Sequence, residues 1–186
     1  MKTLSLTKKY ILAEIAIALF EILFGLLSSS MAMTFLGVYS VVSVFCTASY
    51  ESFPKSKLAN LGFLALAAFS VVLAWVSVYN VHLTIGYADK AVAFWGLIPP
   101  IVVFFAKAGF TSLFSEENEI EEKKYLFTEI IDYKYDFLLI VSAILSIFLT
   151  FVFDFYVEYI VALGISLCCI RKVFLTAKAR RNISEV

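Results

Sequence analysis

The sequence predicts an all-α integral membrane protein with six transmembrane helices in a single domain, residues 1–186. Hydrophobic residues make up 62% of the chain, against about 45–50% in soluble domains. They gather in six stretches, each near the ~20 residues that a helical span requires. All six should be helical, because an open strand cannot satisfy its backbone polar groups in lipid. The predicted spans are residues 10–27, 31–47, 58–79, 90–114, 125–153 and 155–175.

The basic residues between these stretches predict the orientation. If six helices alternate, nearly all of them fall on one side of the membrane: Lys2, Lys8, Lys9, Lys55, Lys57, Lys123, Lys124, Arg171, Lys172, Lys178, Arg180 and Arg181. The positive-inside rule then places both termini in the cytoplasm. We expect a multi-pass protein surrounded by the lipid bilayer, in a prokaryotic inner membrane. The formal net charge is zero, so nothing in it suggests a nucleic-acid partner.

The first span carries two acidic residues that lipid would not accept. Glu14 and Glu21 are seven positions apart and share one helix face with Gly25. Ionisable residues inside spans usually face the bundle interior and mark ion or proton paths. Both glutamates are therefore candidates for a proton or cation pathway. The alternative is a structural role, with each carboxyl hydrogen-bonded to Ser, Tyr or Lys inside the bundle.

The second span places three weaker ligands on one face. Tyr39, Ser43 and Cys46 follow the spacing i, i+4, i+7 and offer a phenol, a hydroxyl and a thiol. They are secondary candidates for binding a metal ion. Packing between helices is the alternative interpretation for all three.

The fifth span begins with the densest group of carboxylates. Glu129, Asp132 and Asp136 lie at i, i+3 and i+7, so they share one helix face. The two aspartates are four residues apart, about 6 Å on a helix, so both can reach one cation. We expect Asp132 and Asp136 to bind a metal, and Glu129 to belong to the pathway. The alternative is an interfacial pair held by Lys107, Lys124 or solvent.

Two further features concern the connections between spans. Five glutamates between Glu116 and Glu122 predict a solvated acidic loop on the cytoplasmic side. The single histidine, His82, is expected in an external loop, so a histidine-based metal site is not expected.

The fourth and sixth spans contain features that affect their helices. Pro99 and Pro100 are predicted in the middle of the fourth span, where two missing N–H groups would kink it. Asp154 and Glu158 are predicted to cap the N-terminus of the sixth helix, where negative charge is favourable.

Three segments together resemble the transmembrane domain of the cation diffusion facilitators, which export divalent metals in exchange for protons. They are SSSMAMTFLGVYSVVS, DYKYDFLLIVSAILSIFL and FDFYVEYIVALGISLCCIRKVFL. The resemblance implies that Asp132 and Asp136 form the half of the transport site on the fifth helix. Tyr39 and Ser43 stand where the family has His or Asp followed by Asp on the second helix. Many members continue into a cytoplasmic domain beyond the point where this chain ends, at Val186.

The expected function is therefore transport of a divalent cation such as manganese, iron or zinc, as proton-coupled efflux from the cytoplasm. The metal ion is a substrate, no prosthetic group is expected, and the resemblance implies a homodimer or hetero-oligomer. The alternative is a non-transporting relative that acts as a partner or regulator, because Tyr39 and Ser43 are uncharged. The sequence contains no nucleophile and base pair, phosphate loop or metal-hydrolase motif, so we do not expect an enzyme.

Overall fold

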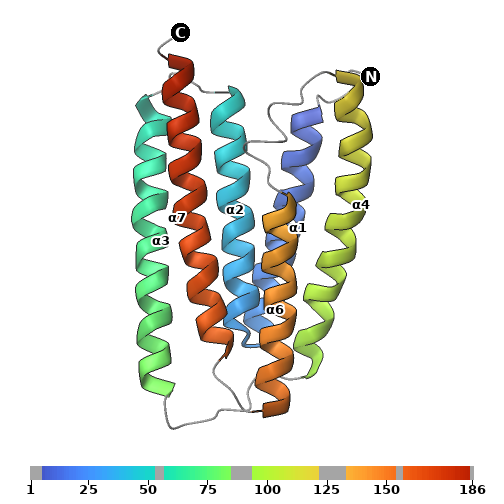
Figure 1. Cartoon of the computed structure of the whole chain (residues 1–186), viewed down its shortest axis with the longest axis vertical. Helices are drawn as coiled ribbons and strands as arrows, with labels where there is room; N and C mark the ends of the chain where they lie inside the picture. Colours follow the sequence, from blue (N-terminus) through green and yellow to red (C-terminus); the bar gives the residue numbers. More distant parts are fainter. Residues whose placement is uncertain (1–5, 53–56, 85–93, 122–132, 154–156, 185–186) are drawn as a thin grey trace.

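The computed structural model describes residues 6–52, 57–84, 94–121, 133–153 and 157–184. These residues are all helical apart from the short turn between the first two helices, as predicted. The elements are α1 (Leu6–Leu27), α2 (Met31–Ser52), α3 (Lys57–Thr84), the 3-10 helix η1 (Phe94–Leu97), α4 (Ile98–Glu121), α6 (Tyr133–Phe153) and α7 (Val157–Ser184). The helices lie side by side along one axis, with the start of α1 and the end of α7 at the same end of the bundle (Figure 1).

Among the described helices, four are long and apolar enough to cross a membrane. The qualifying segments are Lys8–Leu27, Met31–Ser49, Tyr135–Val152 and Val157–Ala179. α3 and α4 contain shorter apolar segments, Leu61–Val76 and Ile98–Ser112. Large apolar side chains also face outward, as in α3, where Leu64 is 68% exposed and Trp75 is 71% exposed. This distribution indicates a membrane protein.

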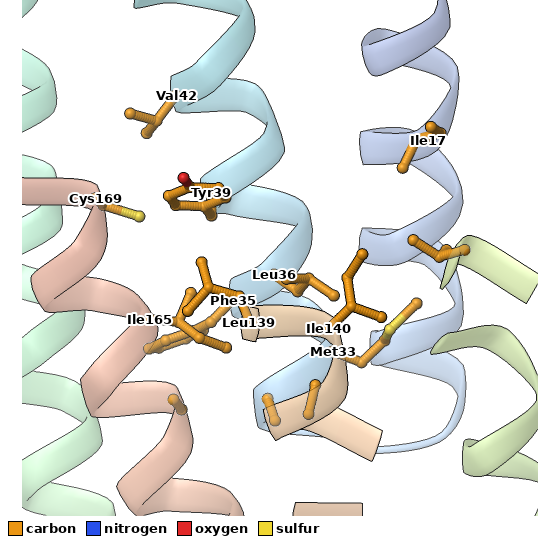
Figure 2. Close-up of a cluster of buried hydrophobic side chains, with 14 of the residues drawn as sticks. Ile17, Met33, Phe35, Leu36, Tyr39, Val42, Leu139, Ile140, Ile165 and Cys169 are labelled. Atoms are coloured by element: carbon orange, nitrogen blue, oxygen red, sulfur yellow. The ribbon is translucent and has the colours of Figure 1, made fainter. Parts of the chain in front are cut away.

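α2 lies at the centre of the bundle. It packs against α1, α6 and α7, while α3 packs on α7, and α4 packs on both α1 and α6. The apolar core between these helices includes Met33, Leu36 and Val42 of α2, with Ile140 of α6 and Ile165 of α7 (Figure 2). The central position of α2 lets its polar side chains contact residues of several helices.

The turn between α1 and α2 is a Schellman motif. The Ser30 amide donates to the Gly25 carbonyl at 2.8 Å, and the Ser29 amide donates to the Leu26 carbonyl at 3.2 Å. Ser29 adopts a positive φ of 56°. The Ser30 hydroxyl then accepts the Met33 amide at 3.2 Å, so Ser30 also caps α2. Three residues thus end one helix and begin the next.

We predict that Ser29→Gly stabilises the protein. A left-handed conformation costs a residue with a Cβ about 1–2 kcal/mol, and glycine avoids this strain. The Ser29 side chain is exposed, so its removal should lose few stabilising contacts. The midpoint of unfolding in mixed detergent micelles should rise. Ser29→Ala, which retains the Cβ, is the matched control and should leave the midpoint almost unchanged.

α1 and α2 approach each other closely through two glycines. A Cβ added to Gly25 would lie 2.5 Å from the Thr34 amide nitrogen, and one added to Gly37 would lie 2.8 Å from the Ile22 nitrogen. Small residues permit such backbone contact between membrane helices. The close approach brings the acidic face of α1 against α2.

Three expectations about helix limits are wrong. α4 begins at Ile98, so Pro99 and Pro100 occupy its first turn, where a missing N–H leaves no helix hydrogen bond unmade. The helix continues to Glu121 because glutamate is a good helix former, so the acidic segment up to that residue is not a loop. α3 extends to Thr84, which places His82 in a helix.

Glu158 lies in the first turn of α7 but caps a different helix from the one predicted. Its Oε1 accepts hydrogen bonds from the Ser30 hydroxyl and, at 3.3 Å, from the Ala32 amide. These donors belong to the N-terminus of α2, which favours a carboxylate through its exposed amides and its dipole. These hydrogen bonds link the start of α7 to the turn between α1 and α2. Asp154 lies outside the described residues.

We predict that Glu158→Ala lowers the free energy of unfolding by about 1–3 kcal/mol, because it leaves two buried donors without their acceptor. Unfolding in mixed micelles measures the change. Glu158→Gln keeps an acceptor oxygen and should lose less. Equal losses in the two variants would show that the hydrogen bonds to Ser30 and Ala32 contribute little.

Candidate functional site

Five charged side chains are buried together inside the bundle, and we call them the charge network. They come from α1, α4, α6 and α7, and none is more than 7% exposed: Glu14, Glu21, Lys107, Asp136 and Lys172. The acidic face of α1 is therefore buried, as predicted. Charges at this density inside an apolar bundle are costly unless they are paired.

Lys107 of α4 lies at the centre of the network. Its Nζ lies 3.3 Å from Glu14 Oε2 and 3.8 Å from Asp136 Oδ2. It also donates a hydrogen bond to the Ser40 hydroxyl of α2 at 3.2 Å. One ammonium group thus contacts three helices, and it joins two carboxylates that would otherwise repel each other.

Lys172 of α7 approaches the other carboxylate oxygen of Asp136. Its Nζ lies 3.9 Å from Asp136 Oδ1. It donates to the Ser43 hydroxyl at 2.7 Å and to the Tyr39 hydroxyl at 3.4 Å, and lies 4.8 Å from the centroid of the Tyr39 ring. The ring therefore adds a cation–π contact. Asp136 is held between two ammonium groups.

Glu21 is connected to the network differently from the other two acids. Its Oε2 accepts a hydrogen bond from the Ser40 hydroxyl at 2.7 Å. Its Oε1 is buried and has no hydrogen-bond partner among the described residues. No lysine lies within ion-pair distance of its carboxyl in that part of the chain, so Glu21 is linked to Lys107 through Ser40.

Glu14, Lys107 and Lys172 lie inside the apolar segments of their helices, and Asp136 lies at the start of its own. Lys107 is nine residues from the start of α4 and Lys172 is fifteen from the start of α7, which correspond to about 14 and 23 Å along the helix axes. The hydrocarbon core of a bilayer is about 30 Å thick. α6 begins below the upper ends of α2, α4 and α7 (Figure 1), and Asp136 lies in its first turn, where the helix dipole favours an anion.

A pocket reaches the network from the side where α1, α4 and α6 meet. Its polar lining consists of Tyr10, Glu14, Lys107, Thr111 and Asp136. Two carboxylates and one ammonium of the network therefore border a cavity of about 10 Å³, a volume on the scale of one water molecule or one metal ion.

The metal site predicted from the sequence is only partly described. Asp132 and Glu129 lie outside the described residues. In the described ranges, no group of three or more His, Cys, Asp or Glu side chains is arranged to hold a metal ion. Asp136, Tyr39 and Ser43 do come together, but they surround the ammonium of Lys172.

The remaining sequence candidates fall into two groups. Cys46 is fully buried in the apolar cluster of the core, which agrees with the packing interpretation. Glu14 contacts Lys107, which agrees with the structural role given above as the alternative for the first span. Asp136 also contacts Lys107, which agrees with the alternative in which Lys107 holds the aspartates.

Sequence reasoning misses Lys172 and Ser40 as members of the site, and it identifies Lys107 only as a possible partner of the aspartates. By its position, Lys172 looks like one of the basic residues that flank the last span. The available signal was the position of Lys107, a lone cation within the apolar segment Ile98–Ser112.

No protein-family model matches the chain, and no curated protein or solved structure gave a significant match. The resemblance to the cation diffusion facilitators therefore stays a prediction.

Proposed function

We propose that the protein is a transporter that moves a divalent cation across the membrane in exchange for protons, with six spans and both termini in the cytoplasm. The observation that carries this proposal is Asp136, a buried carboxylate held between two ammonium groups beside a pocket. Buried ionisable groups in membrane proteins most often belong to ion or proton pathways. The shared position of the start of α1 and the end of α7 supports the topology (Figure 1).

Cation binding would take place on Glu14 and Asp136. Both carboxylates contact Lys107 and both border the pocket, so an entering cation competes with this ammonium for the same oxygens. Their two negative charges, which Lys107 and Lys172 balance in this structure, would then be shared with one divalent cation. Carboxylate oxygens suit hard cations, so manganese and iron are preferred over zinc.

Competition of this kind gives two exclusive states of the site. In one, Lys107 joins α1, α4 and α6 through its ion pairs. In the other, the cation takes the carboxylates, and the ammonium keeps its contact with Ser40 of α2. A ligand shifts the equilibrium between two conformations of a protein only if its contacts differ between them. The exchange of the partners of Lys107 supplies such a difference.

A second candidate function is that of a non-transporting partner or regulator. Lys172 favours it, because this ammonium already lies among Tyr39, Ser43 and Asp136. These are the positions where the resemblance places the metal. A tethered cation could replace the transported one permanently and lock the bundle in one state.

Titration calorimetry of the purified protein with Mn²⁺, Fe²⁺, Zn²⁺ and Cd²⁺ tests the proposal. The transporter proposal predicts saturable binding that Asp136→Asn abolishes. Glu158→Gln, which neutralises a buried carboxylate outside the network, is the matched control and should retain binding. Folded wild-type protein that binds none of the four ions would favour the second candidate.

A further inference from the structure

We propose that Glu21 is a neutral carboxylic acid that stores the exchangeable proton of the charge network, and that Ser40 is the hydroxyl through which it is connected to Lys107. The protonation of Glu21 stands on the geometry alone. Its role as carrier of the coupled proton rests on the proposed function.

The first support is the count of charges. The network contains three carboxyl groups and two ammonium groups, so within the described part of the chain one carboxyl group lacks a counter-charge. Lys107 pairs with Glu14 and Asp136, and Lys172 pairs with Asp136. Glu21 is 0% exposed, and an ionised carboxylate without a counter-charge is very costly in an apolar interior. Protonation of Glu21 removes this cost and makes the network neutral.

The second support is the direction of the hydrogen bonds. The Ser40 oxygen accepts a hydrogen from Lys107, so its single hydrogen is directed to Glu21 Oε2. Glu21 Oε2 therefore acts as an acceptor, as the carbonyl oxygen of an acid does. Because Oε2 accepts the Ser40 hydrogen, Oε1 is the oxygen that carries the acid proton.

The surroundings of Glu21 hold this arrangement in place. A Cβ added to Gly37 would lie 3.0 Å from the Cβ of Glu21, so α2 packs directly on the glutamate. The charged groups around Glu21 are Lys107 of α4, Glu14 on its own helix and Asp136 of α6. Lys107 is the one connected to it by hydrogen bonds, through Ser40.

A proton at Glu21 gives the proposed transporter a coupling stoichiometry. When a divalent cation binds to Glu14 and Asp136, the network gains two positive charges. Release of the Glu21 proton removes one of them, and its return when the cation leaves restores neutrality. The expected exchange is one proton for each divalent cation.

Infrared difference spectroscopy of the purified protein tests the inference without any transport measurement. Spectra of the wild type and of Glu21→Gln are subtracted, in H₂O and in D₂O. The expected result is loss of the carbonyl stretch of a protonated carboxylic acid, with the shift in D₂O that an O–H group produces. Loss of the two stretches of an ionised carboxylate would overturn the inference.

Two further measurements keep the result interpretable. Glutamine resembles a neutral acid in shape and charge, so Glu21→Gln should melt at the wild-type temperature. A clearly lower melting temperature would contradict a neutral Glu21. Glu158→Gln is the matched control for loss of a buried glutamate, and the band assigned to Glu21 should remain in its spectrum. A wild type that transports no cation but shows the band would refute the proposed function and leave this inference standing.

Discussion

Asp136→Asn should lower the free energy of unfolding by about 3–5 kcal/mol, the usual cost of removing one partner from a buried ion pair, and should abolish cation transport. Asp136 contacts Lys107 at 3.8 Å and Lys172 at 3.9 Å, so its neutralisation leaves both ammonium groups without this shared counter-charge. Asparagine keeps the volume of the side chain, so the loss reports on charge rather than on packing. Unfolding in mixed detergent micelles measures the stability.

The matched control for this variant is Ser146→Ala on the same helix. Ser146 is fully buried, and its hydroxyl donates to the carbonyl of Ala143 in its own helix. Its replacement should change stability little and leave transport intact. Asp136→Glu keeps the charge and should recover part of the stability lost in Asp136→Asn. An Asp136→Asn protein as stable as the wild type would show that the two lysines do not depend on Asp136.

Lys107→Met should have a similarly large effect, for the opposite reason. Methionine fills much of the volume of the lysine but leaves Glu14 and Asp136 close together without the ammonium between them. We expect a loss of about 3–5 kcal/mol, by the same reasoning about broken buried pairs. Thermal unfolding monitored by helical circular dichroism would measure it.

A double variant tests whether the loss arises from the unpaired charge. Lys107→Met combined with Glu14→Gln removes both members of one ion pair, so it should be more stable than Lys107→Met alone. Arg171→Gln is the control for loss of a cation. Arg171 is exposed and lies over the ring of Tyr135 at 4.2 Å, so its replacement should change stability little. A double variant no more stable than the single one would refute the coupling of Lys107 and Glu14.

The sequence predicts the helical architecture well because the apolar stretches are long and the acidic face of α1 has helical spacing. Glu14 and Glu21 share a face that lipid cannot accept, so their burial follows from local spacing alone. The partners of these acids depend on tertiary packing. Lys107 and Lys172 lie 65 residues apart, and neither spacing nor composition indicates that both approach Asp136.

The helix ends show the same limit of prediction from sequence, because contacts between distant residues are not visible in local spacing. Ser28 to Ser30 mark a turn in the sequence, yet the cap that Glu158 provides joins residues 128 positions apart. Composition also misled the prediction near Pro99 and Pro100, because an apolar run that continues through two prolines resembles one span. The helix begins beside them instead, where proline is tolerated.

Cation-driven proton flux in proteoliposomes of the purified protein tests the central claim most directly, with Mn²⁺ as the first ion and Asp136→Asn and Ser146→Ala as paired variants. The proposed transporter predicts proton movement that depends on the Mn²⁺ gradient, persists in Ser146→Ala and disappears in Asp136→Asn. Flux of equal size in Asp136→Asn, from protein shown to be folded, would contradict the assignment of the charge network as the transport site.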